Sequence, residues 1–286
     1  YHDGHRSLTG RRDPVFEVPI FGDDGALRDE RTIRVTDNPN VSTDWAVMTG
    51  TISGLGGITK AGTGLLILTA SNSYSGGTTI SGGQLLFTNG AALGTGTITL
   101  STDTMLASDT SRILTAAVSM SGAITFSNPG TMSFTSANTN IVNGATIISN
   151  NTAGLTFSNP TLLTGTDASL TVTSGGTVTF GGVISQSGFN YSVVSSNMGG
   201  IVLNGINLSA GAAARNLTLS STGLGSIIVN GTIADGTALG GALVISSGSV
   251  TLNGTSSYSG GTTLVAGTLA IGNSSALGTG ALTLSG

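Results

Sequence analysis

Hydrophobic residues in this chain fall in short runs that glycine, asparagine and serine interrupt. The runs are three to six residues long and rich in β-branched and aliphatic residues, as in Leu65–Leu68, Thr177–Phe180 and Ile227–Val229. Leucine does not recur at the i, i+3, i+4 spacing of an amphipathic helix. Lysine and glutamate, which favour helices, are also scarce, because the residues after 44 contain one lysine and no glutamate. Dipeptides such as Asn89-Gly90 and Asn230-Gly231 tolerate positive φ and mark turns. The pattern therefore predicts many short strands, each followed by a turn.

Strands of this length suit a solenoid better than a sandwich, because each coil of a solenoid stacks on the previous one and needs only short sides. About 240 residues at about 22 per coil give roughly eleven coils, and at about 4.8 Å per coil the rod is near 50 Å long. The predicted fold is all-β: a parallel β-helix, or β-solenoid, preceded by an extended or hairpin arm.

Composition supports the solenoid and excludes several functional classes. Glycine, serine and threonine supply 46, 37 and 44 of the 286 residues, whereas only 22 are charged, 9 basic and 13 acidic. Like charges on successive coils would repel along the stack, whereas Thr, Ser and Asn can pair with their own copies. A net charge of −4 without a basic patch excludes cationic binding of nucleic acid. The absence of cysteine excludes a disulfide scaffold and a Cys-ligated zinc site. The sequence contains no run of about 18 apolar residues, so it predicts no transmembrane helix.

Charge is concentrated at the N-terminus. Residues 1–44 hold 15 of the 22 charged side chains together with both histidines, His2 and His5, whereas residues 45–286 hold seven. A shift of this size marks a boundary between two parts of a chain. We therefore divide the protein into a charged arm, residues 1–44, and a nearly uncharged β-solenoid, residues 45–286.

The arm contains two segments that alternate apolar and polar residues. Val15–Phe21 and Thr32–Thr36 read as strands, with an Asp-rich turn between them. They either form a hairpin that caps the first coil, or dock on a neighbouring subunit by adding a strand to its open end. The apolar side chains that would make this subunit interface are Phe16, Val18, Ile20, Phe21, Ile33 and Val35.

An internal repeat lies inside the solenoid. Residues 74–101 and 258–285 align without a gap at an offset of 184, with 17 identities in 28 positions. We expect each copy to form one coil with three faces, which in the first copy are Thr78–Ile80, Gln84–Phe87 and Thr97–Leu100. The residues that define the repeat are a tyrosine, an inward-facing leucine and the corner glycines: Tyr74, Gly76, Gly77, Leu85, Gly94 and Gly96 in the first copy, and Tyr258, Gly260, Gly261, Leu269, Gly278 and Gly280 in the second.

The shared sequence resembles a known family. Both copies read Tyr-Ser-Gly-Gly-Thr-Thr, then Gly-x-Leu, Asn, Ala-Leu-Gly-Thr-Gly and Thr-Leu-Ser, and this pattern is similar to the autotransporter-associated β-strand repeat, also named the passenger-associated transport repeat. The resemblance implies a right-handed parallel β-helix that is exported and displayed at the surface of a Gram-negative-type bacterium. Such a protein would be the passenger, the displayed part, of an autotransporter.

Chemistry-bearing residues are scarce in the solenoid. Asp103, Asp109 and Arg112 form its one local cluster, and parallel β-helix polysaccharide lyases and hydrolases use clustered acids with a basic partner. A solvated loop is the favoured interpretation of this trio, because no His, Cys or Glu accompanies it. The acidic turn at Asp23 and Asp24 lacks the spacing of a calcium loop. We expect no enzyme activity, no cofactor and no bound metal.

These observations together predict an exported structural surface protein, the subunit of an extracellular fibre or filament. Copies would join head to tail through the arm and the uncapped last coil, because a heterologous contact of that kind makes open filaments. An adhesin-type passenger segment of an autotransporter is the alternative, and binding to a host or glycan surface stays open. A β-helix polysaccharide lyase or hydrolase is the least favoured reading.

Overall fold

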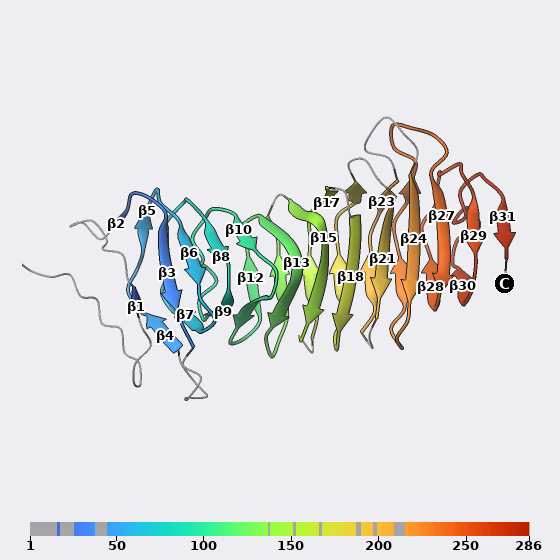
Figure 1. Cartoon of the computed structure of the whole chain (residues 1–286). Coiled ribbons are helices and arrows are strands. Elements are labelled where there is room, and N and C mark those ends of the chain that lie inside the picture. Colours follow the sequence, from blue (N-terminus) through green and yellow to red (C-terminus); the bar gives the residue numbers. More distant parts are fainter. Residues whose placement is uncertain are drawn as a thin grey trace, which may run out of the picture.

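The computed structural model describes residues 16–17, 26–37, 45–136, 138–150, 153–165, 168–186, 190–196, 199–208 and 215–285. Within these ranges the chain forms 31 strands and no helix, and so no helix there is long and apolar enough to cross a membrane. Figure 1 shows the strands stacked along one axis, from β1 at one end to β31 at the other, as a β-solenoid of about ten turns. The predicted fold class is confirmed and the turn count is close to the roughly eleven expected, whereas the handedness stays a prediction.

Three series of parallel strands form the three faces of the coil. Face I contains, in order, β3 (Arg31–Val35), β6 (Ile58–Ala61), β8 (Thr78–Ile80), β10 (Ile98–Leu100), the first halves of β13 (Val118–Ser127) and β15 (Thr139–Ser149), β17 (Thr161–Thr164), β20 (Ile184–Gln186), β23 (Ile206–Asn207) and β26 (Ile233–Ala234). Face II contains β4 (Trp45–Met48), β7 (Leu65–Leu68), β9 (Gly83–Phe87), β11 (Thr104–Ser108), the second halves of β13 and β15, β18 (Ala168–Ser174), β21 (Tyr191–Ser195), β24 (Asn216–Ser221), β27 (Ala242–Ser247), β29 (Thr262–Leu264) and β31 (Leu282–Leu284). Face III contains β12 (Arg112–Leu114), β14 (Met132–Phe134), β16 (Leu155–Phe157), β19 (Val178–Phe180), β22 (Ile201–Leu203), β25 (Ile227–Val229), β28 (Ser249–Leu252) and β30 (Thr268–Ile271).

Alternating side chains build one core that runs the length of the solenoid. Strand after strand shows the sequence buried, half-buried, buried, because neighbouring residues of a strand point to opposite sides. Three phenylalanines on successive coils of face III, Phe134, Phe157 and Phe180, stack with their ring centroids 5.2 Å apart at each step. This distance is close to the strand spacing of about 4.8 Å, so stacking adds ring contacts to the strand pairing.

The solenoid begins before residue 45. β3 pairs in parallel with β6, and β2 (Ala26–Leu27) pairs in parallel with β5 (Ser53–Gly54), although β2 and β3 lie in the segment that charge assigned to the arm. β1 (Phe16–Glu17) pairs antiparallel with β3, as in a hairpin laid on the first coil. Thr32 and Arg34 are exposed while Ile33 and Val35 are buried, so the charged side chain of Arg34 lies on the outside of the coil.

The repeat is longer than one coil, which corrects its expected layout. Thr97–Leu100 was predicted to be the third face, but β10 pairs in parallel with β8 and therefore lies on face I one coil later. Successive strands are only 20 residues apart here, since Ile58 pairs with Thr78 and Thr78 with Ile98. A repeat of 28 residues must then pass face I twice, and turns instead of a strand form its third side.

The two repeats also start on different faces. In the first copy β6, β8 and β10 lie on face I, whereas their counterparts β27, β29 and β31 lie on face II. Eight coils separate β6 from β26 along face I, and the step to β27 adds a third of a coil. The repeat is therefore a local packing unit that works on either face.

Candidate functional site

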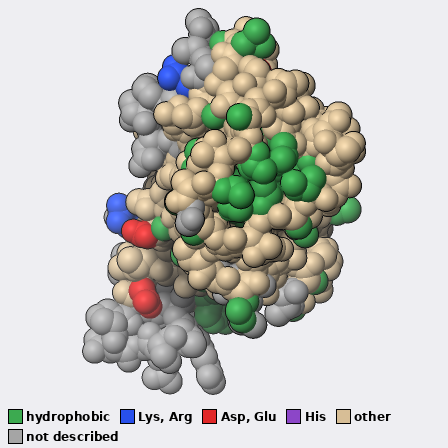
Figure 2. Space-filling model, turned by 90° about the vertical axis from the view of Figure 1, so that its right-hand side faces the viewer, with side chains coloured by type: hydrophobic (Ala, Val, Ile, Leu, Met, Phe, Trp, Pro, Cys, Tyr) green, Lys and Arg blue, Asp and Glu red, His purple; other side chains and the backbone are tan. Residues whose placement is uncertain are grey.

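The last described coil exposes apolar side chains. Val265, Ile271, Leu282 and Leu284 are 40%, 49%, 44% and 69% exposed. Figure 2 looks onto the end of the solenoid near the C-terminus and shows hydrophobic side chains gathered at its centre. We call these four residues the C-terminal end surface.

The first repeat shows what these positions do when another coil follows. Phe87, Ile98 and Leu100 stand where Ile271, Leu282 and Leu284 stand in the second repeat, and they are 0%, 0% and 1% exposed. β11 pairs with β9 and β13 pairs with β10, whereas no described strand pairs with the outer edge of β30 or β31. Exposure at the end surface thus follows from the lack of a covering coil within the described residues.

The opposite end of the core is closed. Leu27, Val35 and Ala46 belong to the first coil, and they are only 1%, 0% and 1% exposed. The first coil therefore keeps these core side chains covered, whereas the last described coil exposes apolar side chains.

A buried tyrosine ties each repeat together. The Tyr74 hydroxyl lies 2.5 Å from the Thr78 hydroxyl, which donates to the Leu93 carbonyl at 2.8 Å, and Tyr258 and Thr262 repeat the first contact at 2.5 Å. Burial raises the pKa of Tyr74 to about 12 and raises the pKa of Tyr258. The predicted repeat residues accordingly have structural positions: both tyrosines are fully buried, as is Leu85, while Leu269 packs against the core half-buried.

Corner glycines of the repeat stand where a side chain cannot fit. Gly94 has a φ of +70°, and a Cβ there would lie 2.5 Å from the Tyr74 carbonyl oxygen. Gly278 repeats this geometry against Tyr258, with a φ of +69°. The other predicted glycines face the backbone of the neighbouring coil at similarly short range: Gly76, Gly77, Gly96, Gly260, Gly261 and Gly280.

The predicted cluster of Asp103, Asp109 and Arg112 does not form one group in the structure. Asp109, in the turn after β11, makes an ion pair of 2.6 Å with Arg112, the first residue of β12, and Arg112 also donates to the Thr88 carbonyl. Asp103 precedes β11, at the other end of that five-residue strand. At about 3.3 Å per residue the two ends are roughly 16 Å apart, too far for a joint reaction.

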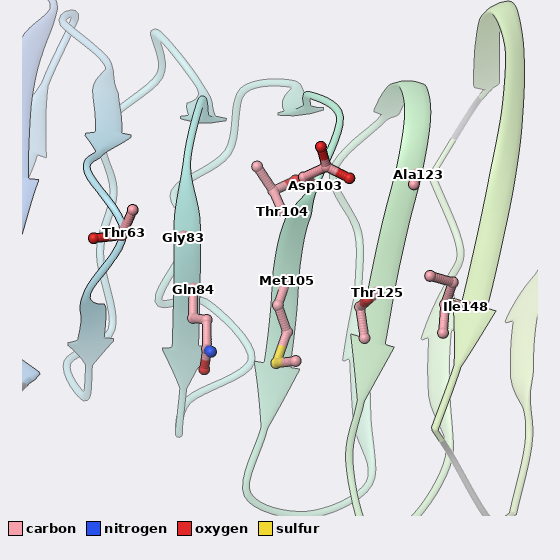
Figure 3. Close-up of a pocket in the computed structure, with 9 residues that line it drawn as sticks. All are labelled: Thr63, Gly83, Gln84, Asp103, Thr104, Met105, Ala123, Thr125 and Ile148. Carbon is pink, nitrogen blue, oxygen red and sulfur yellow. The ribbon is translucent and has the colours of Figure 1, made fainter. Parts of the chain in front are cut away.

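Asp103 instead lines a hollow on the surface where faces I and II meet. Figure 3 shows Gln84, Met105, Thr125 and Ile148 in a row across β9, β11, β13 and β15, with Asp103 above them. The hollow has a volume of about 330 Å³, and its remaining lining residues are Thr63, Gly83, Thr104 and Ala123. Sequence reasoning found Asp103 but not the row, because a register across four strands cannot be read from residue spacing alone.

Two further charged side chains of the solenoid are buried and satisfied by the protein itself. Lys60 is fully buried, and its ammonium donates to the carbonyls of residues 61, 62 and 82 at 3.1, 2.8 and 2.9 Å. Burial lowers the pKa of Lys60 to about 8. The Asp235 carboxylate accepts from the backbone N–H of Gly241 and from both the N–H and the hydroxyl of Ser259. The described residues contain no group of three His, Cys, Asp or Glu side chains that could hold a metal ion.

The residues predicted for a subunit interface are only partly placed. Ile33 and Val35 are 4% and 0% exposed and face the protein's own core, so their side chains are not free to meet a partner. The reason is the parallel pairing of β3 with β6, which turns this side of the strand inward. Phe16 pairs through its backbone with Val35. The side chain of Phe16, and Val18, Ile20, Phe21, His2 and His5, lie outside the described residues.

Comparison with known proteins agrees with the repeat. The family model of the passenger-associated-transport-repeat matches residues 58–86 and 241–271. These segments begin at β6 and β27 and overlap the 28-residue repeats in part. No curated protein and no solved structure matches the chain. The chain is thus a β-solenoid that carries two passenger-associated transport repeats.

Proposed function

We propose that this protein is a structural rod of a secreted or surface-displayed bacterial protein, and that copies join head to tail through the C-terminal end surface. The repeat family supports a passenger-like surface protein. The filament is our extension of that statement. The single observation that carries it is that Ile271, Leu282 and Leu284 hold positions that a following coil covers in the first repeat, so this surface calls for a covering coil, from the same protein or from a second copy.

Strand direction favours a head-to-tail contact. Each junction between coils pairs strands in parallel, for example β29 with β31. At the other end of the rod β4 pairs only with β7, and β2 only with β5, among the described strands. Placing β4 of one copy beyond β31 of the next would continue face II in parallel, and it would cover the apolar side chains.

Burial of the end surface supplies the driving force. A valine, leucine or isoleucine side chain contributes about 1.5–3 kcal/mol when it is fully buried, and the end surface is about half exposed. Four such side chains therefore contribute a few kcal/mol, and the free backbone edges add hydrogen bonds. We expect an association that depends on protein concentration.

We also propose a structural and not a catalytic role. The support is that Asp109 pairs with Arg112, Asp235 accepts from backbone donors and Lys60 donates to carbonyls, while Asp103 has no second titratable residue beside it in the hollow that it lines. Hydroxyl groups without an adjacent base are poor nucleophiles.

The test is electron microscopy and light scattering of residues 1–286 and of Leu284→Lys. A lysine at this exposed position is tolerated by the monomer but places an unpaired charge in the contact. We expect fibres or multimers for the wild type and single rods for Leu284→Lys, whereas Leu239→Lys, a change at an 80% exposed loop residue, assembles normally. Single rods of wild-type protein at every concentration would favour the second candidate, an adhesin-type passenger segment.

A further inference from the structure

We propose that the hollow at the corner of faces I and II binds a short neutral oligosaccharide. We call this hollow the corner groove; it is lined by Thr63, Gly83, Gln84, Asp103, Thr104, Met105, Ala123, Thr125 and Ile148. The inference does not depend on assembly, since the groove lies on the side of the rod and not at its end (Figure 3).

Asp103 differs from the other described carboxylates between residues 45 and 286. Asp109 is held by Arg112, and Asp235 is 4% exposed and accepts from three donors at 3.0 Å or less. Asp103 is exposed, and no described donor contacts its carboxylate. In a chain that avoids charge along its coils, this carboxylate is available to a ligand.

The backbone holds Asp103 firmly at the edge of the groove. Its φ is 58°, in the left-handed region that few side chains adopt. Its N–H donates to the Ala123 carbonyl at 2.7 Å, and the Thr104 hydroxyl donates to the Ser101 carbonyl at 2.6 Å. A polar group fixed in this way needs little ordering when it binds.

The row below Asp103 supplies complementary contacts. Gln84, Met105, Thr125 and Ile148 are in register on neighbouring strands, Met105 opposite both Gln84 and Thr125, and Thr125 opposite Ile148. An amide and a hydroxyl both donate and accept, whereas the thioether and the isoleucine offer apolar contact. Binding sites combine apolar lining with a few convergent polar groups in this manner.

These groups select the class of ligand. No lysine or arginine lines the groove, and Asp103 repels anions, so phosphates, sulfates and uronates fit poorly. One carboxylate is too few for a metal site. Sugar hydroxyls both donate and accept, so they match a carboxylate, an amide and threonine hydroxyls at once, while the C–H face of a sugar ring matches Met105 and Ile148.

The experiment is saturation-transfer NMR with the full chain and four probes: maltose, cellobiose, N,N′-diacetylchitobiose and, as the anionic comparison, digalacturonic acid. The variants are Asp103→Asn, which keeps a side chain that tolerates the left-handed backbone, and Gln84→Ala. Thr218→Ala is the matched control, because Thr218 is a half-exposed residue of the same face on β24, outside the groove. Circular dichroism checks that all three variants remain folded.

We expect at least one neutral probe to bind, digalacturonic acid to bind more weakly, and Asp103→Asn to weaken the neutral probe about tenfold, as loss of a charged hydrogen bond does. Gln84→Ala should weaken it by a smaller factor, and Thr218→Ala should leave it unchanged. The proposal is overturned if no neutral probe binds, if digalacturonic acid binds as well as the neutral probes, or if Asp103→Asn binds like the wild type.

Discussion

Leu100 and Leu284 hold the same position in the two repeats, so replacing each by alanine isolates the effect of a covering coil. Leu100 is 1% exposed, and β13 pairs with its strand. Deleting its side chain leaves a cavity and costs about 2–5 kcal/mol. Leu284 is 69% exposed, so only about a third of the 1.5–3 kcal/mol that burial of a leucine contributes is at stake, about 0.5–1 kcal/mol.

The assay is urea unfolding of Leu100→Ala, Leu284→Ala and wild type, followed by far-UV circular dichroism in solutions dilute enough to hold single copies. We expect the free energy of unfolding to fall by at least about 1 kcal/mol more for Leu100→Ala than for Leu284→Ala. Equal losses would refute the reasoning, because they would mean that the last coil is as well covered in a single copy as the coil at β10. Light scattering on the same samples verifies that they are monomeric.

Three further changes test the interior. Burial lowers the pKa of Lys60 from 10.5 to about 8, so the unfolded chain holds this proton more tightly than the folded one. The free energy of unfolding of the wild type, relative to that of Lys60→Met, should therefore rise by about 2 kcal/mol between about pH 7 and pH 9.5. A difference between the two proteins that stays constant with pH in urea unfolding would contradict this. Gly94→Ala places a Cβ 2.5 Å from the Tyr74 carbonyl oxygen at a positive φ and should cost at least about 1–3 kcal/mol by thermal unfolding, whereas Gly90→Ala, which meets no atom closer than 3.5 Å, should change stability by less than about 0.5 kcal/mol. Phe157→Ala removes the ring stacked 5.2 Å from both Phe134 and Phe180 and should cost about 3–5 kcal/mol; a urea-unfolding loss below about 2 kcal/mol would speak against a close-packed core.

Much of the fold could be predicted because its signals are local. Short β-branched runs closed by Asn-Gly turns identified the strands, and alternation placed Leu85 in the core, where it is fully buried. The repeat was visible because its tyrosine, threonine and glycines serve contacts within one coil or between neighbours, such as Tyr74 with Thr78. These features need no knowledge of distant parts of the chain.

The rest depends on how coils register with one another. Coil length varies from 19 residues between Leu65 and Gln84 to 27 between Ile206 and Ile233, so neither the third side of the repeat nor the change of face between its copies follows from the offset of 184. The groove requires the register of four strands. Lys60 can be buried because its ammonium donates to carbonyls of its own coil and to that of residue 82 on the next coil. The position of a single lysine in the sequence does not predict these contacts.

The distribution of charge predicted that the solenoid begins at residue 45, which is too late, for a related reason. Arg31 and Arg34 belong to β3, whose alternate residues Ile33 and Val35 are buried. Among the described strands β3 has one parallel neighbour, β6, because its other edge pairs antiparallel with β1, so the repulsion that excludes like charges from the middle of the stack is weaker there. Composition therefore marks where the stacking constraint becomes strict, which is later than where the first parallel strand pair forms.

Sedimentation velocity on residues 1–286 across a wide range of concentrations, with Leu284→Lys beside the wild type, tests the proposed assembly most directly. We predict that the wild type sediments as multimers whose size grows with concentration, and that Leu284→Lys stays a single rod with unchanged circular dichroism. A wild type that remains monomeric throughout, or a Leu284→Lys variant that assembles as well as the wild type, would contradict assembly through the C-terminal end surface.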